Sequence, residues 1–160
     1  MKIICQTDEE IEIIGDTLAG AQLDGMNLHR ALLEGQDMQD ASLVGTDLRG
    51  ASVSGANLTR ANLNSASLIT AFFTEVSLQN ANLRGCRAIG CHFDKADLRG
   101  SDFSDADISG ASFQEARLEG ATMQVARIER ANFTGAFFDK STRWPVGFDP
   151  LSAGATKVES

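Results

Sequence analysis

The feature that most constrains the fold is a five-residue repeat without insertion or deletion. Residues 16–140 divide into 25 groups of five, and the third residue of every group is apolar, from Leu18 to Phe138. With 42% hydrophobic residues in the chain, chance would give this pattern roughly once in 10⁹ sequences. The first residue is Ala in 17 groups and the fifth is Gly in 12. A repeat this regular indicates a solenoid, in which one small unit is stacked many times.

The period of five suits neither an α-helix, with 3.6 residues per turn, nor an uninterrupted strand, with a period of two. It suits a short extended side followed by a turn. The first and third residues of each group then face inward, and the second, fourth and fifth face solvent. Gly is favoured at the fifth place because a turn with positive φ costs it nothing sterically. Ala is favoured at the first place because a larger side chain would overfill a narrow lumen.

The repeat resembles that of the pentapeptide-repeat family. The second position favours Asn, Asp and Ser, and the run Ala56-Asn57-Leu58-Thr59-Arg60-Ala61-Asn62-Leu63 shows the family pattern directly. The resemblance covers about four-fifths of the chain. It implies an all-β fold, a right-handed quadrilateral parallel β-helix of about six coils of 20 residues, stacked about 4.8 Å apart. The expected organisation is 1–15 as an N-terminal strand or cap with a degenerate first repeat, 16–140 as the β-helix, and 141–160 as a C-terminal cap with a mobile tail.

Two patterns are consistent with a coil of 20 residues. Phe73, Phe93, Phe113 and Phe133 are 20 apart and would form one internal stack. Charges 20 apart also tend to oppose, as in Asp40 and Arg60, although spacings of 15 and 25 favour opposite pairs as well. Ala88 is the one small residue at an inward third position, so either a void lies there or Ile89 turns inward.

The N-terminal segment offers a way to close the first coil. Ile11 and Ile13 are in the inward register, so Ile11–Gly15 is interpreted as a degenerate first group. Met1–Cys5 could be a short covering strand, with Thr7–Glu10 as a polar connection. An uncovered end would expose unpaired backbone and core to solvent or to another rod.

The C-terminal segment begins where the repeat stops. Pro145 and Pro150 cannot donate ladder hydrogen bonds and so end the pairing. The run from Thr142 to Pro150 resembles the segment that often closes cyanobacterial members of the family, which implies that Trp144 and Phe148 lie over the last coil. We expect the indole N–H of Trp144 to reach a terminal carbonyl, and Leu151–Ser160 to be mobile. The alternative is a bare end that pairs with a second copy, so the chain is either a monomer or an end-to-end homodimer.

Composition excludes several classes of partner and compartment. The net charge of −8 and the absence of a basic footprint argue against direct binding to nucleic acid. No stretch approaches the apolar length of a membrane span or of a signal peptide. Three cysteines cannot all pair, which favours free thiols and a cytoplasmic location.

No catalytic constellation emerges from the sequence. His29 and His92 fall at outward positions on different sides, with no motif around either. Cys86 and Cys91 occupy consecutive inward first positions, where they are expected to pack as small hydrophobes rather than bind metal. A filled lumen leaves no concave pocket for a small substrate. We therefore expect no enzymatic activity, no cofactor and no metal.

The outward positions are polar with few exceptions, and some of these exceptions cluster. Ile69 and Ile89 are 20 apart, and Phe72 follows round the next corner beside His92. Clustered exposed apolar residues mark interaction surfaces more often than scattered ones do. The predicted partner-binding patch comprises Ile69, Phe72, Arg84, Arg87, Ile89 and His92.

Three functions remain after these exclusions. The leading one is a non-enzymatic protein-binding or scaffolding module whose partner is unknown. Family resemblance adds a DNA mimic that binds DNA gyrase or topoisomerase IV, and a regulator of a bacterial developmental or stress pathway. A mimic needs a continuous anionic face, whereas residues 56–93 carry one acid and three bases. The mimic is therefore disfavoured.

Overall fold

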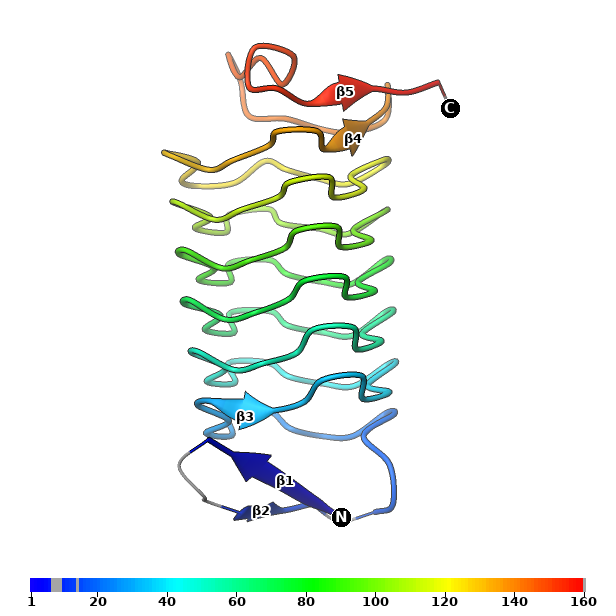
Figure 1. The fold of residues 1–160 in the computed structure, drawn as a ribbon, viewed down its shortest axis with the longest axis vertical. Coiled ribbons are helices and arrows are strands. Elements are labelled where there is room, and N and C mark those ends of the chain that lie inside the picture. Colours follow the sequence, from blue (N-terminus) through cyan, green and yellow to red (C-terminus); the bar gives the residue numbers. More distant parts are fainter. Residues whose placement is uncertain (7–9, 14, 160) are drawn as a thin grey trace.

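The chain forms an elongated rod of stacked coils (Figure 1). The computed structural model describes residues 1–6, 10–13 and 15–159. Parallel β-bridges join each second-position residue to the one 20 residues further on, from Gln22 with Ser42 to Arg117 with Phe137. The expected parallel β-helix with a 20-residue coil is confirmed.

Each coil turns its corners at the fourth and fifth residues of the repeat. The fifth residue has a positive φ in 23 of the 25 groups. The backbone N–H of the following residue donates to the carbonyl of the third, as from Ala61 to Leu58 at 3.0 Å. A positive φ at the third place of such a turn is the mark of a type II turn. The exceptions are Val125 and Lys140, where the last coil departs from the repeat.

The second position stabilises the turn that follows it. The side-chain oxygen of Asn57 accepts a hydrogen bond from the backbone N–H of Thr59 at 3.1 Å, and Asn82 accepts in the same way from Arg84 at 3.0 Å. Asn and Asp make this two-residue contact because their side chains are short and carry an acceptor at the right reach. This explains the preference for Asn and Asp at the second place.

The lumen is filled by the first and third residues of the repeat. The third residue is buried in 24 of the 25 groups, the exception being half-buried Ile128. Thr46 and Ser101 replace Ala at first positions, and their buried hydroxyls donate to the carbonyls of Leu23 and Leu98. Burial of these hydroxyls is therefore compensated by hydrogen bonds.

The predicted phenylalanine stack is confirmed. Ring centroids lie 5.6 Å apart for Phe73 and Phe93, 5.1 Å for Phe93 and Phe113, and 5.0 Å for Phe113 and Phe133. Near it, the backbone around Ala88 keeps the regular turn, with the Cys91 N–H donating to the Ala88 carbonyl at 3.1 Å. Ile89 therefore stays at an outward position.

Three short strands close the N-terminal end. β1 (Lys2–Cys5) lies between β2 (Glu10–Glu12) and β3 (Ala31–Leu32) and pairs antiparallel with both. Ile3 and Cys5 are buried against the first coil. The end of the rod is thus covered by a strand that runs against the direction of the coils.

The segment interpreted as a degenerate first repeat is organised differently. Ile11 pairs with Ile3 in the β1–β2 hairpin, antiparallel, whereas the repeats pair in parallel. Of the predicted connection Thr7–Glu10, Glu10 instead begins β2, and residues 7–9 lie outside the described residues, as does residue 14.

The C-terminal segment folds back over the last coil. The Trp144 ring lies edge-on to Phe133 and Phe138, with centroids at 5.2 and 5.7 Å, and it stacks on Phe148 at 5.1 Å. The expected hydrogen bond is not present, because Nε1 of Trp144 is buried without an acceptor among the described residues. The apolar contacts of the indole, and not its N–H, hold this segment in place.

The prediction that Leu151–Ser160 is a mobile tail is wrong for the part that pairs with the last coil. β5 (Thr156–Lys157) pairs in parallel with β4 (Phe137–Phe138). The N–H of Thr156 donates to the carbonyl of Ala136 at 2.7 Å, and that of Val158, just after β5, donates to the carbonyl of Phe138 at 2.8 Å. Ala155 is buried. Residues 154–158 thus continue the stack by part of a further coil.

Candidate binding surface

The outer surface of the rod consists of columns of residues 20 apart. Two neighbouring sides and the corner between them carry the candidate residues. The Phe72 side is the column of Leu32, Ser52, Phe72, His92 and Ser112, and the Arg87 side is the column of Asp47, Ser67, Arg87 and Asp107. The shared corner is the stack of fifth-position residues Arg30, Gly50, Thr70, Gly90, Gly110 and Arg130, which belong to turns leading from the Arg87 side to the Phe72 side.

Phe72 is the largest exposed apolar side chain in the middle of the rod, with 46% of its surface accessible. Its ring is stacked on the imidazole of His92, with centroids 5.2 Å apart and planes within 3°. The Nδ1 atom of His92 lies 3.8 Å from a carboxylate oxygen of Asp94. The two stacked rings therefore hold one another in place on the Phe72 side, and this pair is called the platform below.

Ile69 and Ile89 lie beside this platform at the shared corner. Both are half-buried fourth-position residues of the Arg87 side, in successive coils. Ile89 also lines a shallow hollow of about 510 Å³ with Gly90 and Arg130. The structure thus brings Ile69, Phe72, Ile89 and His92 onto adjoining parts of one surface.

The backbone at the centre of this surface is strained. Thr70 has a φ of 54°, and it is the β-branched residue among the non-glycine residues that adopt a positive φ. Such a conformation is a clear outlier for a β-branched side chain. Strain of this kind persists where the surrounding structure enforces it, and it concentrates at functional sites.

The two predicted arginines are placed differently from one another. Arg87 lies on the Arg87 side, next to the shared corner. Arg84 belongs to the turn at the other end of that side, and its guanidinium lies 3.4 Å from carboxylate oxygens of Asp102 and Asp105. The prediction that Arg84 flanks the platform is therefore not supported by its position.

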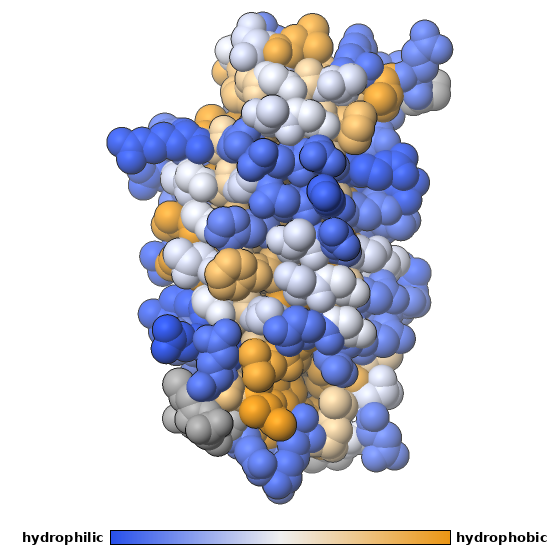
Figure 2. Space-filling view, viewed as in Figure 1, coloured by the Kyte–Doolittle hydropathy of each residue, from blue (hydrophilic) through white to orange (hydrophobic). Residues whose placement is uncertain are grey.

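The column of Phe72 extends the apolar surface towards the N-terminus. Leu32 is 39% exposed, and Ile4, which pairs with it across β1 and β3, is 49% exposed. Apolar atoms gather at the N-terminal end of this face (Figure 2). Leu32 is 40 residues before Phe72, so the period could have placed it in the patch. The antiparallel pairing of Ile4 left no signal in the repeat.

Five of the ten ion pairs among the described residues join the second and fourth residues of one repeat. Asp47 with Arg49 and Asp97 with Arg99 are 2.6 and 2.5 Å apart. The Arg49 guanidinium, which donates to Asp47, holds the pKa of that carboxyl below its usual range. Four more join neighbouring coils, among them Arg60 with Asp40 at 2.7 Å. The 20-residue period predicted the pair of Arg60 with Asp40, but it did not predict the ion pairs between the second and fourth residues of one repeat.

The cysteines have the environment of packed hydrophobes. Cys86 and Cys91 are both fully buried, and burial raises the pKa of the Cys86 thiol to about 12. A thiol held protonated in this way is a poor nucleophile and a poor metal ligand. Within the described ranges, no group of three or more His, Cys, Asp or Glu side chains is arranged to hold a metal ion.

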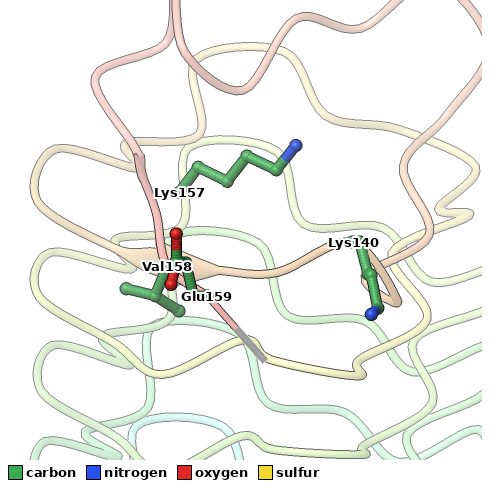
Figure 3. A pocket seen from close by; sticks show the side chains of 4 residues that line it. All are labelled: Lys140, Lys157, Val158 and Glu159. Carbon is green, nitrogen blue, oxygen red and sulfur yellow. The ribbon is translucent and has the colours of Figure 1, made fainter.

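A second surface hollow lies at the C-terminal end. Lys140 lines it together with Lys157, Val158 and Glu159 of the tail, and its volume is about 520 Å³. Figure 3 shows the two lysine side chains extending in different directions, so their ammonium groups do not converge on one point.

Over the part of the chain that the structure covers, there is no helix long and apolar enough for a membrane span.

Stacked 20-residue coils with a filled lumen define a parallel β-solenoid. A family model described as "Pentapeptide repeats (8 copies)" matches this chain over overlapping ranges, which are residues 18–55, 41–80, 56–92, 77–114 and 111–142. The chain belongs to the pentapeptide-repeat family. A comparison with curated proteins gave no significant match.

Several solved structures share the fold. Rfr23, a pentapeptide-repeat protein of the cyanobacterium Cyanothece, is 22% identical with a TM-score of 0.51 over 78% of this chain and 88% of its own. QnrB1, a plasmid-mediated fluoroquinolone resistance protein, is 20% identical with a TM-score of 0.61 over 89% and 79%. HetL of the cyanobacterium Nostoc, involved in heterocyst differentiation regulation, is 21% identical with a TM-score of 0.48 over 87% and 82%. At these identities the likeness to Rfr23 and QnrB1 concerns the fold alone.

Proposed function

We propose that this protein is a non-enzymatic, cytoplasmic protein-binding rod whose partner docks on the platform of Phe72 and His92. The observation that carries the proposal is the exposed Phe72 ring stacked on His92 in the middle of a rod whose outward positions are mostly polar. Aromatic side chains that are both exposed and fixed in place are typical anchors of protein interfaces, because little conformational entropy is lost when they are covered.

Two further features support this choice. Ile69 and Ile89 add half-buried apolar surface beside the platform, and the strained turn at Thr70 lies between them and Phe72. The filled lumen supports a function on the outside of the rod, since reacting groups need a concave site to exclude water. Neither nucleic acid nor a membrane is expected as the partner, in keeping with the acidic surface of the chain.

The two other functions considered from the sequence have weaker support. A DNA mimic requires an uninterrupted anionic face, but arginines stand beside the carboxylates, as in the pairs of Asp40 with Arg60 and Asp97 with Arg99. A role in regulating a bacterial pathway is compatible with a binding rod, and the identity of the partner would decide it.

The test is affinity capture from extracts of the producing cells, with proteins quantified by mass spectrometry. Phe72→Ser should abolish capture of at least one protein that the unchanged chain retains. Phe137→Ser is the matched control, because Phe137 is also an exposed second-position phenylalanine, 37% accessible, on a different side. Identical captures by the unchanged chain and by Phe72→Ser would contradict the proposal.

A further inference from the structure

A hollow of about 400 Å³ lies at the shared corner, on the N-terminal side of the platform. Gly50, which has no side chain, belongs to its lining and lies between Arg30 of the preceding coil and Thr70 of the following coil. The rest of the lining is Phe72, His29, Arg49 and Gln6. The hollow exists because the corner stack loses a side chain at Gly50, where a φ of 62° favours glycine.

The described residues that line the hollow include two arginines and no acid, although the chain as a whole is acidic. The first 55 residues carry ten acids and only three bases, yet two of those bases, Arg30 and Arg49, line this one site. Arg49 is paired with Asp47 at 2.6 Å. Arg30 makes no ion pair with any residue that the structure describes. An arginine guanidinium beside an apolar wall is a recognition feature for a carboxylate.

The surroundings set the direction in which a ligand would lie. On one side of the hollow, Phe72 and Leu32 offer exposed apolar surface two coils apart, about 10 Å along the rod. Beyond them, the far edge of the Phe72 side carries Glu34, Glu75 and Asp94. A bound carboxylate would be repelled from that edge and attracted towards Arg30, with its apolar neighbours over Phe72 and Leu32.

Building on the proposed function, we infer that the partner inserts a short acidic and apolar segment here. One carboxylate of the segment enters the hollow over Gly50 and contacts Arg30 and Arg49. Apolar side chains next to it cover Phe72 and Leu32. Because this contact area is small, the isolated segment binds weakly and the charge sets specificity.

Selection of random peptides of about twelve residues, displayed on phage, against the full chain tests the inference. The enriched peptides should combine carboxylates with apolar residues. For a synthetic copy of the best peptide, Gly50→Asn should raise the Kd by about tenfold or more, because Asn tolerates the left-handed turn and its side chain fills the hollow. Arg30→Glu should have a similar effect through charge.

Gly45→Asn is the matched control, since Gly45 lies in the same coil with a φ of 64° and open space around it. It should change the Kd by about twofold or less. The inference is overturned if no peptide is enriched, if the enriched peptides are basic, or if both glycine variants weaken binding equally. If Phe72→Ser abolishes capture from extracts but Gly50→Asn leaves the Kd of the peptide unchanged, the proposed function is supported and the inference of an acidic segment is wrong.

Discussion

At the scale of single residues, the largest local conformational cost of the fold lies at the fifth position of each repeat, where the backbone adopts a positive φ. Glycine meets the positive φ at twelve of these positions, and Asp, Asn, Ser or a long charged residue meets it at most of the others. Thr70 is the least suited of them, because its branched Cβ crowds the backbone in the left-handed region. Natural proteins retain such strain mainly where function requires the residue.

Thr70→Asn should therefore stabilise the rod. Asn adopts a positive φ readily and, unlike Gly, adds little freedom to the unfolded chain, so we expect a gain of about 1 kcal/mol. Thermal unfolding followed by circular dichroism measures it. Thr74→Asn is the control, since Thr74 is not among the positive-φ residues, and it should give no gain. A loss of stability in Thr70→Asn would show that the turn is not strained.

At the scale of elements, the two ends depend on contacts that the repeat does not encode. Asp139 is buried where the repeat gains one residue, since Arg143 pairs with Thr122, 21 residues earlier. Its carboxylate accepts hydrogen bonds from the N–H groups of Gly120, Ser141 and Thr142. The hydrogen bonds, that from the Ser141 side chain foremost, hold the pKa of Asp139 below its usual range.

This pKa shift predicts a loss of stability in acid. Because the folded-state pKa is the lower one, the contribution is present above the unfolded value, 3.8, and is lost as the pH falls below it. Asp139→Asn should lower the free energy of unfolding at neutral pH by about 1 to 2 kcal/mol, and with it the melting temperature. The difference in melting temperature between this variant and the unchanged chain should shrink at acid pH. Asp16→Asn, at an exposed position, is the control. A difference that stays constant across the titration would contradict this role.

The sequence predicted the elements unequally, for a physical reason. Inward residues such as Phe73 and Phe113 were placed correctly because burial depends on side-chain chemistry, which the period records. The sequence predicted a covering strand at Met1–Cys5 but not its antiparallel pairing with β3, and it did not predict β5 at Thr156–Lys157, because both pairings depend on backbone groups that every residue possesses. The candidate surface was predicted in part: the period aligned Phe72 with His92, but nothing in it revealed the hollow over Gly50.

At the scale of the whole molecule, the C-terminal cap decides whether the rod is complete as one chain. The cap consists of side chains from the same chain, with Trp144 packed on Phe133, Phe138 and Phe148. A cap of this kind does not depend on a second copy.

We therefore expect the fluorescence of Trp144, the single tryptophan, to be that of a buried indole at every protein concentration. Sedimentation velocity on the same samples reports the oligomeric state. An emission that shifts towards that of exposed indole on dilution, together with the loss of a dimer, would show that a second chain completes the cap.

The central claim is that the five-residue register separates an outer, binding surface from an inner core, and two neighbouring phenylalanines test it most directly. Phe72 is 46% exposed, while Phe73 is fully buried in the ring stack with Phe93. Phe73→Asp should abolish cooperative thermal unfolding, because an unpaired carboxylate in the dry lumen costs more than about 4 kcal/mol. Phe72→Asp should melt within a few degrees of the unchanged chain. Equal damage from both substitutions would contradict the register and the surface built on it.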